Sequence, residues 1–182
     1  MFQLSKAVVE LAKTKGVILK DLNLENYPQW DIKYFVLPTG LKVRVGTFVN
    51  GSERNKKKYL VFLNGRNEYM EKYSYLPKDL DLGEDIGFLT WDHRGQGESE
   101  GERGYIDSYD LFVDDMRCII EKMIPQDASY VIMGHSMGAL ISLVGMAKGK
   151  ISPQKALLLS PLLGLPYSSL QMFFVDMIIK FL

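Results

Sequence analysis

The chain has 182 residues, which is long enough for one domain with a sizeable core. Hydrophobic residues make up 47% and charged residues 24%, a composition typical of soluble globular proteins. The 22 basic and 22 acidic side chains cancel, which excludes the overall basic excess of many nucleic-acid-binding domains, and we expect no nucleic-acid partner. The single cysteine, Cys118, excludes an internal disulfide.

The N-terminal segment, residues 1–29, is predicted to be helical and to carry no secretory signal. No unbroken apolar stretch is present in it, because charged side chains occur at Lys6, Glu10, Lys13 and Lys15. We therefore expect a cytoplasmic protein.

The C-terminal segment, residues 155–182, is more apolar than the N-terminal one but does not have the pattern of a membrane-spanning segment. Proline, glycine and charged side chains interrupt it, and no clean run reaches the roughly 18 to 20 residues that a span needs. The pattern favours a core strand followed by an apolar helix. We expect membrane contact to be peripheral at most.

Between these ends, short apolar runs alternate with amphipathic segments. Residues 33–50 contain two β-prone runs around Pro38-Thr39-Gly40, which predicts a hairpin. The remaining elements are expected, in chain order, as a strand at 58–65, a helical segment around 69–73, a strand within 85–97 that runs into a glycine-rich loop, a helix at 107–124, a strand at 129–134, a helix at 136–149 and a strand at 155–160. Asp107 or Ser108 can cap the helix at 107–124. This rhythm predicts an α/β fold with a mostly parallel sheet covered on both faces.

A serine lies in the spacing Gly-x-Ser-x-Gly, with Gly134, Ser136 and Gly138 between an apolar strand and a helix. In a strand–turn–helix setting this spacing exposes the serine oxygen at the end of a sheet, and the tight turn leaves no room for side chains at the glycines. The helix N-terminus favours negative charge beside the serine. The alternative is that Ser136 only caps the helix, which explains neither glycine.

A nucleophilic serine acting on a carbonyl needs two backbone donors nearby. The N–H of Met137, directly after the serine, is one candidate. The other is the N–H of Arg66, in the loop at 62–69 where Gly65 allows a bend. A plain Asn-Gly turn explains that loop equally well.

The order "NGRNEY", "WDHRGQGESEGERG", "GHSMGALISL" and "LLLSPLLGL" resembles the α/β-hydrolases that include monoacylglycerol lipases, bacterial lysophospholipases and serine aminopeptidase-like members. The resemblance covers about residues 30 to 170. It implies an α/β-hydrolase fold, Ser136 as the nucleophile, and the backbone amides of Met137 and Arg66 as the oxyanion hole. It also implies that residues 92–97 form a structural loop beside the site, and we expect neither a cofactor nor a metal ion.

Two positions depart from the pattern of these hydrolases. Many have His-Gly where this chain has Asn64-Gly65, and many have a glycine where Ala139 stands. Both departures look tolerable, because the oxyanion donors are backbone groups.

In these hydrolases the triad acid and histidine follow the nucleophile in the chain. After Ser136 this sequence has one acidic residue, Asp176, which lies in an apolar stretch, and no histidine. Of the two histidines upstream, His135 adjoins the nucleophile with its side chain expected to point away, and the resemblance assigns His93 to loop packing.

The resemblance implies an N-terminal portion of a hydrolase, cut after the sixth strand, with core residues 30–165 and the start of a lid at 166–182. We expect the acid and histidine to come from a C-terminal complementing fragment. The expected function is hydrolysis of a small lipid ester, of lysophospholipase or monoacylglycerol lipase type, through an acyl-serine. The alternatives are an inactive truncated remnant, a non-enzymatic binding module on the hydrolase scaffold, and a peptidase, thioesterase or small-ester hydrolase of the same architecture.

Overall fold

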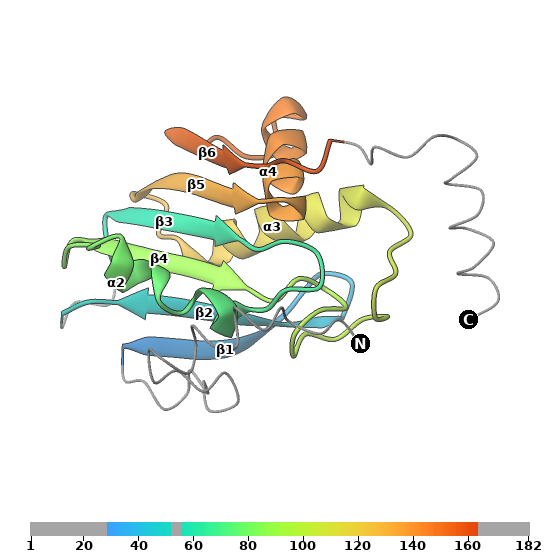
Figure 1. Cartoon of the computed structure of the whole chain (residues 1–182), viewed down its shortest axis with the longest axis horizontal. Coiled ribbons are helices and arrows are strands. Elements are labelled where there is room, and N and C mark those ends of the chain that lie inside the picture. Colours follow the sequence, from blue (N-terminus) through green and yellow to red (C-terminus); the bar gives the residue numbers. More distant parts are fainter. Residues whose placement is uncertain (1–28, 52–55, 164–182) are drawn as a thin grey trace, which may run out of the picture.

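Six strands form one sheet in the computed structural model, which describes residues 29–51 and 56–163 (Figure 1). The order across the sheet is β1-β2-β4-β3-β5-β6. The strands are β1 (Trp30–Val36), β2 (Lys42–Val49), β3 (Lys58–Leu63), β4 (Ile86–Trp91), β5 (Ser129–His135) and β6 (Lys155–Leu159). The expected N-terminal helical segment, the lid segment at 166–182 and Asp176 lie outside the described residues.

The sheet is mostly parallel, as the sequence predicted. The predicted hairpin is present: β1 and β2 pair antiparallel, and the turn between them is closed by a hydrogen bond from the Gly40 N–H to the Leu37 carbonyl at 2.8 Å. β2 is antiparallel to β4, and the pairs β3–β4, β3–β5 and β5–β6 are parallel. The carboxyl ends of β3, β4 and β5 therefore meet at one edge of the sheet.

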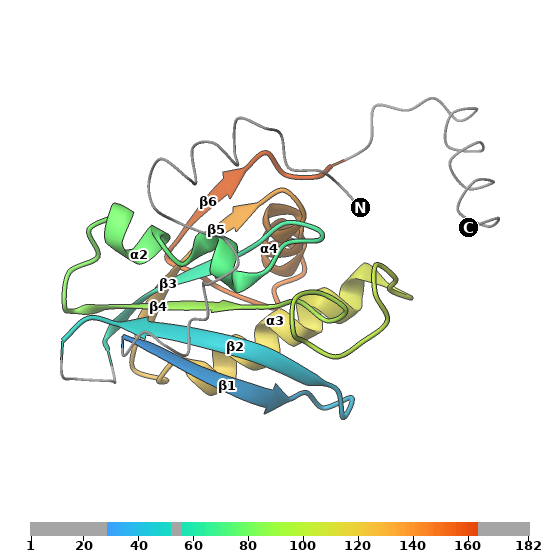
Figure 2. The ribbon, with the colours of Figure 1, turned by 60° about the horizontal axis from the view of Figure 1, so that its bottom comes forward.

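Helices cover one face of the sheet, and shorter turns cover the other (Figure 2). α3 (Tyr109–Met123) and α4 (Met137–Ala147) pack on the face that receives Val61 and Leu63 of β3. Phe62, between those two residues, points to the opposite face, where η2 (Met70–Tyr73) and α2 (Leu76–Asp79) lie. This period-two alternation, with both faces covered, explains why β3 is apolar at consecutive positions from Tyr59 to Leu63.

The helical predictions differ in outcome, and α4 forms where the helix at 136–149 was expected. α3 forms as expected, with Ser108 as its N-cap accepting a hydrogen bond from the Asp110 N–H at 3.2 Å. The segment around 69–73 is only a single turn of 3-10 helix, η2, which α2 follows. No helix in the described ranges is long and apolar enough to cross a membrane.

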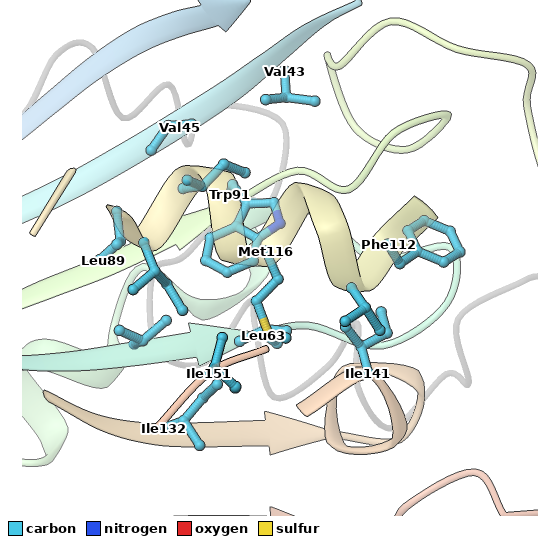
Figure 3. Packing of buried hydrophobic residues seen from close by; sticks show 14 of the residues in the cluster. Val43, Val45, Leu63, Leu89, Trp91, Phe112, Met116, Ile132, Ile141 and Ile151 are labelled. Atoms are coloured by element: carbon cyan, nitrogen blue, oxygen red, sulfur yellow. The ribbon is translucent and has the colours of Figure 1, made fainter. Parts of the chain in front are cut away.

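The larger core lies between the sheet and α3 with α4. Met116 of α3 is fully buried there, and its side chain points toward Leu63 (Figure 3). Its methyl group lies against α4 at Gly145, where an added Cβ would be only 2.4 Å from it. Met116 thus fills the space between β3, α3 and α4.

We predict that Met116→Ala lowers the free energy of unfolding by about 2–5 kcal/mol, because it leaves a cavity among these three elements. Urea unfolding followed by circular dichroism measures the change. Met123→Ala, at the half-buried end of the same helix, is the control and should cost clearly less. Equal losses for the two variants would contradict the central position of Met116.

Candidate active site

Ser136 occupies the turn between β5 and α4 in a strained backbone conformation. Its φ is +52° and its ψ is −112°, a region that residues with a side chain rarely adopt and that costs about 1–3 kcal/mol. Its N–H donates to the Leu159 carbonyl of β6 at 2.9 Å, and its carbonyl accepts from the Leu140 N–H of α4 at 3.1 Å. The strain is therefore maintained by strands and helix on both sides, as in the nucleophile turn of α/β-hydrolases.

The two glycines of the motif are required by close backbone contacts. A Cβ on Gly134 would lie 2.6 Å from the Ala139 nitrogen, and a Cβ on Gly138 would lie 2.3 Å from the Leu63 carbonyl oxygen. Ala139 is itself fully buried. The Ser136 side chain makes no capping hydrogen bond, so helix capping does not describe its role.

The loop after β3, residues 64–69, forms an arm that lies against the start of α4. Asn64 is fully buried and its side-chain amide donates to the Trp91 carbonyl at 3.2 Å, while Arg66 is exposed. Arg66 and Met137, the residues expected to supply the two oxyanion donors, line the same open pocket. The structure thus brings together the two segments that the sequence placed 71 positions apart.

Glu68 ties this arm to the strand that carries the serine. Its Oε2 accepts from the Gly65 N–H at 2.6 Å and from the Tyr73 hydroxyl at 2.7 Å, and it lies 3.4 Å from His135 Nδ1. Burial disfavours its charged form, but hydrogen bonds from Lys72, Tyr73 and the Gly65 N–H outweigh burial and lower its pKa. The sequence analysis did not single out Glu68; its only signal was its place in "NGRNEY".

His135 is not placed to act as the base, because its ring is held against the arm. Its Nδ1 lies 3.3 Å from the Tyr73 hydroxyl as well as beside Glu68. Gly65 leaves the room for this ring, since a Cβ there would lie 3.3 Å from the same nitrogen.

His93 is fully buried and has both ring nitrogens engaged. Its Nδ1 accepts from the Trp91 indole N–H at 3.2 Å, so Nε2 carries the proton and donates to the Asn64 carbonyl at 3.3 Å. Burial lowers the pKa of its imidazole to about 4. With its lone pair occupied, this imidazole has no site left to accept a serine proton.

Asp92 organises the loop after β4 from inside the protein. It is fully buried, and its carboxylate accepts from the Met70 N–H at 2.8 Å and the Glu98 N–H at 3.0 Å. Arg44 of β2, also buried, lies 3.5 Å from it and pairs with Glu71 at 2.6 Å. Burial raises the pKa of Asp92 to about 6, against the backbone donors and Arg44.

No group of three or more histidine, cysteine or acidic side chains suited to a metal ion occurs among the described residues.

We predict that Gly138→Ala lowers the free energy of unfolding by about 1–3 kcal/mol, because the new Cβ would overlap the Leu63 carbonyl of β3. Urea unfolding measures this cost. Gly83→Ala is the control, since its Cβ would meet only the flexible end of Asp85 at 3.1 Å. A neutral Gly138→Ala would contradict the close approach of α4 to β3.

We predict a specific pH dependence from Asp92. Because its folded-state pKa of about 6 lies above the usual value of 3.8, its stabilising contribution is full below about pH 4 and is lost as the pH rises through 6. The free energy of unfolding of the wild type, relative to Asp92→Asn, should therefore fall by up to about 3 kcal/mol between pH 3.5 and 7.

The surface variant Asp127→Asn is the control for this slope. A hydrogen bond from Lys57 lowers the pKa of Asp127, so its contribution has the opposite sign and grows with rising pH. Urea unfolding at a series of pH values measures both. The same slope for Asp92→Asn and the wild type would show that Asp92 does not titrate in this range.

Residues 54–182 match the family model described as serine aminopeptidase, S33. Among curated proteins, the chain is 38% identical over 115 residues to the probable lysophospholipase L2 of Haemophilus influenzae, which covers 60% of this chain and 36% of that protein. It is 35% identical over 109 residues to the monoglyceride lipase of Mus musculus, with coverages of 58% and 35%. The chain thus spans about a third of the length of these relatives.

The comparison with solved structures agrees with these sequence matches. A monoacylglycerol lipase from Paleococcus ferrophilus superimposes with a TM-score of 0.60 at 22% identity, over 75% of this chain and 50% of that one. Est1E from Butyrivibrio proteoclasticus, in a structure with bound ferulic acid, gives a TM-score of 0.59 at 17% identity, over 71% of this chain and 52% of that one. The resemblance inferred from the motifs is confirmed, and the chain belongs to the serine aminopeptidase S33 family of α/β-hydrolases.

Proposed function

We propose that this chain carries the nucleophile and oxyanion hole of a carboxylic ester hydrolase of lysophospholipase or monoacylglycerol lipase type. The observation that carries the proposal is the strained backbone of Ser136 between β5 and α4, beside the arm that holds Arg66. The relatives named lysophospholipase and monoglyceride lipase support a single-chain lipid ester as the substrate.

The reaction proceeds in two acyl transfers. The Ser136 oxygen bonds to the ester carbonyl carbon while a base takes its proton, and the carbonyl oxygen becomes an oxyanion held by the N–H groups of Met137 and Arg66. The carbon–oxygen bond to the alcohol then breaks, and the alcohol leaves with that proton. Water adds to the acyl-serine by the same route, which releases the fatty acid and restores the serine.

The base and its acid come from a separate complementing segment. The sequence contains two histidines; His93 has both nitrogens occupied, and His135 is held by Glu68 and Tyr73. A serine without a base is a weak nucleophile, and loss of a triad member leaves only about 10³- to 10⁴-fold acceleration over water.

The edge of β6 is where we propose that this segment attaches. β6 pairs only with β5 in the described sheet, and its Leu157 and Leu159 are exposed by 51% and 37%. An open apolar strand edge offers unpaired backbone groups and apolar surface to a further strand. A complementing C-terminal fragment that extends the sheet there would supply the acid and the histidine.

We predict that a fluorophosphonate probe labels Ser136 slowly in the chain alone and faster, by about 10³-fold or more, with a complementing fragment. The fragment to test is the part of the Haemophilus influenzae relative that lies C-terminal to the region matched by this chain. Ser136→Ala should abolish labelling, and Ser152→Ala, an exposed serine, should not change it.

Equal labelling of the wild type and Ser136→Ala would refute the nucleophile. Labelling of Ser136 that no fragment accelerates would refute the attachment at β6 and favour a binding module or an inactive remnant. Labelling is read by mass spectrometry of the modified peptide.

A further inference from the structure

A pocket of about 170 Å³ opens directly beside the expected oxyanion donors. Its walls come from the arm after β3, the loop after β4, the first turns of α3 and the first residue of α4. The residues used below are Arg66, Arg94, Gln96, Gly104, Tyr109 and Met137. A group bound there would be a near neighbour of the ester carbonyl that Ser136 attacks.

The pocket carries one uncompensated positive charge. Among the described residues, no aspartate or glutamate lines it. Arg94 is neutralised by two hydrogen bonds to Asp115, each 2.6 Å long. Arg66 has no carboxylate partner among the described residues; its guanidinium donates to the Gly104 carbonyl at 3.3 Å, which holds it across the pocket between the arm and the loop after β4.

Two further polar side chains in the pocket wall, those of Gln96 and Tyr109, can donate hydrogen bonds. Gln96 is buried, with an exposed fraction of 7%, and its Oε1 accepts from the Glu68 N–H at 3.3 Å. This contact fixes the amide, so that its NH₂ faces Met137, where the sulfur at 4.0 Å is a weak acceptor. The Tyr109 hydroxyl adds a further group that can donate.

We propose that this pocket binds the phosphate of a lysophospholipid head group, with the Arg66 side chain as its charged ligand. The inference rests on the proposed ester hydrolysis, because the backbone of Arg66 would hold the carbonyl oxygen while its side chain holds the phosphate. A glycerol unit separates the ester from the phosphate in such a lipid, so the two groups lie close together in the substrate. A planar guanidinium with several donors suits phosphate oxygens better than an ammonium does.

Phosphate binding in this pocket would also hold part of the leaving group of the reaction. The alcohol released when the acyl-serine forms would be the glycerophosphate part of the lipid, and its phosphate would remain in the Arg66 pocket until it dissociates. A neutral monoacylglycerol would leave this charge unpaired. The pocket therefore favours phosphate-bearing lipids over neutral ones of the same acyl chain.

The test measures binding to the whole chain and does not require turnover. sn-Glycerol 3-phosphate, inorganic phosphate and glycerol are titrated separately, with isothermal calorimetry or amide chemical shifts as the readout. We expect glycerol 3-phosphate to bind more tightly than glycerol, and its affinity to fall as salt rises. Arg66→Gln should weaken it by about tenfold or more, and Arg66→Lys by less.

Arg103→Gln is the matched control, because Arg103 is an exposed arginine in the same region that also donates to a glycine carbonyl, Gly97, but does not line the pocket. It should bind as the wild type does. Unchanged affinity in Arg66→Gln, an equal loss in Arg103→Gln, or equal binding of glycerol would overturn the proposal. Inorganic phosphate binding as tightly as glycerol 3-phosphate would overturn the head-group assignment and leave a free-phosphate site.

Ser136→Ala separates this inference from the function on which it rests. It should bind glycerol 3-phosphate normally while losing fluorophosphonate labelling. Labelling of Ser136 without phosphate binding would refute the pocket alone. Arg66-dependent phosphate binding without labelling would refute the hydrolase and retain the anion site. Urea midpoints of all variants check that each is folded.

Discussion

The rest of the site depends on how closely α4 approaches the end of β3 at Gly138. Because a Cβ there would fall 2.3 and 2.5 Å from the carbonyl oxygens of Leu63 and Asn64, only glycine lets the helix start at this point. The approach places Met137 beside the arm and leaves Ser136 no relaxed conformation between β5 and α4. The Asn64 carbonyl also accepts from His93, so the ends of β3, β4 and β5 are joined at one place.

Buried polar groups then keep the loops at this edge in place. Asp92 binds backbone donors from two different segments, at Met70 and Glu98, and Arg44 links it to Glu71. A buried charge is costly unless it is paired and hydrogen-bonded, so these contacts are mutually dependent. Together these contacts hold the loop after β4 beside the arm and the pocket.

The sequence predicted the strands, the hairpin and the long helix, because each is encoded locally by periodicity, turn residues and a capping serine. It predicted the position of Ser136 for the same reason, since the glycines on either side are local requirements of one turn. It did not predict the contact of Glu68 with His135, which are 67 positions apart and meet only because β3 and β5 are neighbours in the sheet. Nor did it predict the burial of Arg44, whose place in a β-prone run gives no sign of the carboxylates supplied by η2 and by the loop after β4.

Backbone groups and side-chain groups have different tasks in the proposed site. Strain at Ser136 and the orientation of backbone N–H groups follow from the sheet, α4 and the arm, and so they belong to the fold of this chain itself. Proton transfer instead needs a side-chain base, and the histidines at hand are already used as structural residues, one pinned by Trp91 and one by Glu68. An oxyanion hole made of main chain can persist without a triad, because nothing in its geometry depends on the base. The positioning half of such an active site is therefore a property of this fold, whereas proton transfer depends on a base that the proposed function assigns to a complementing segment.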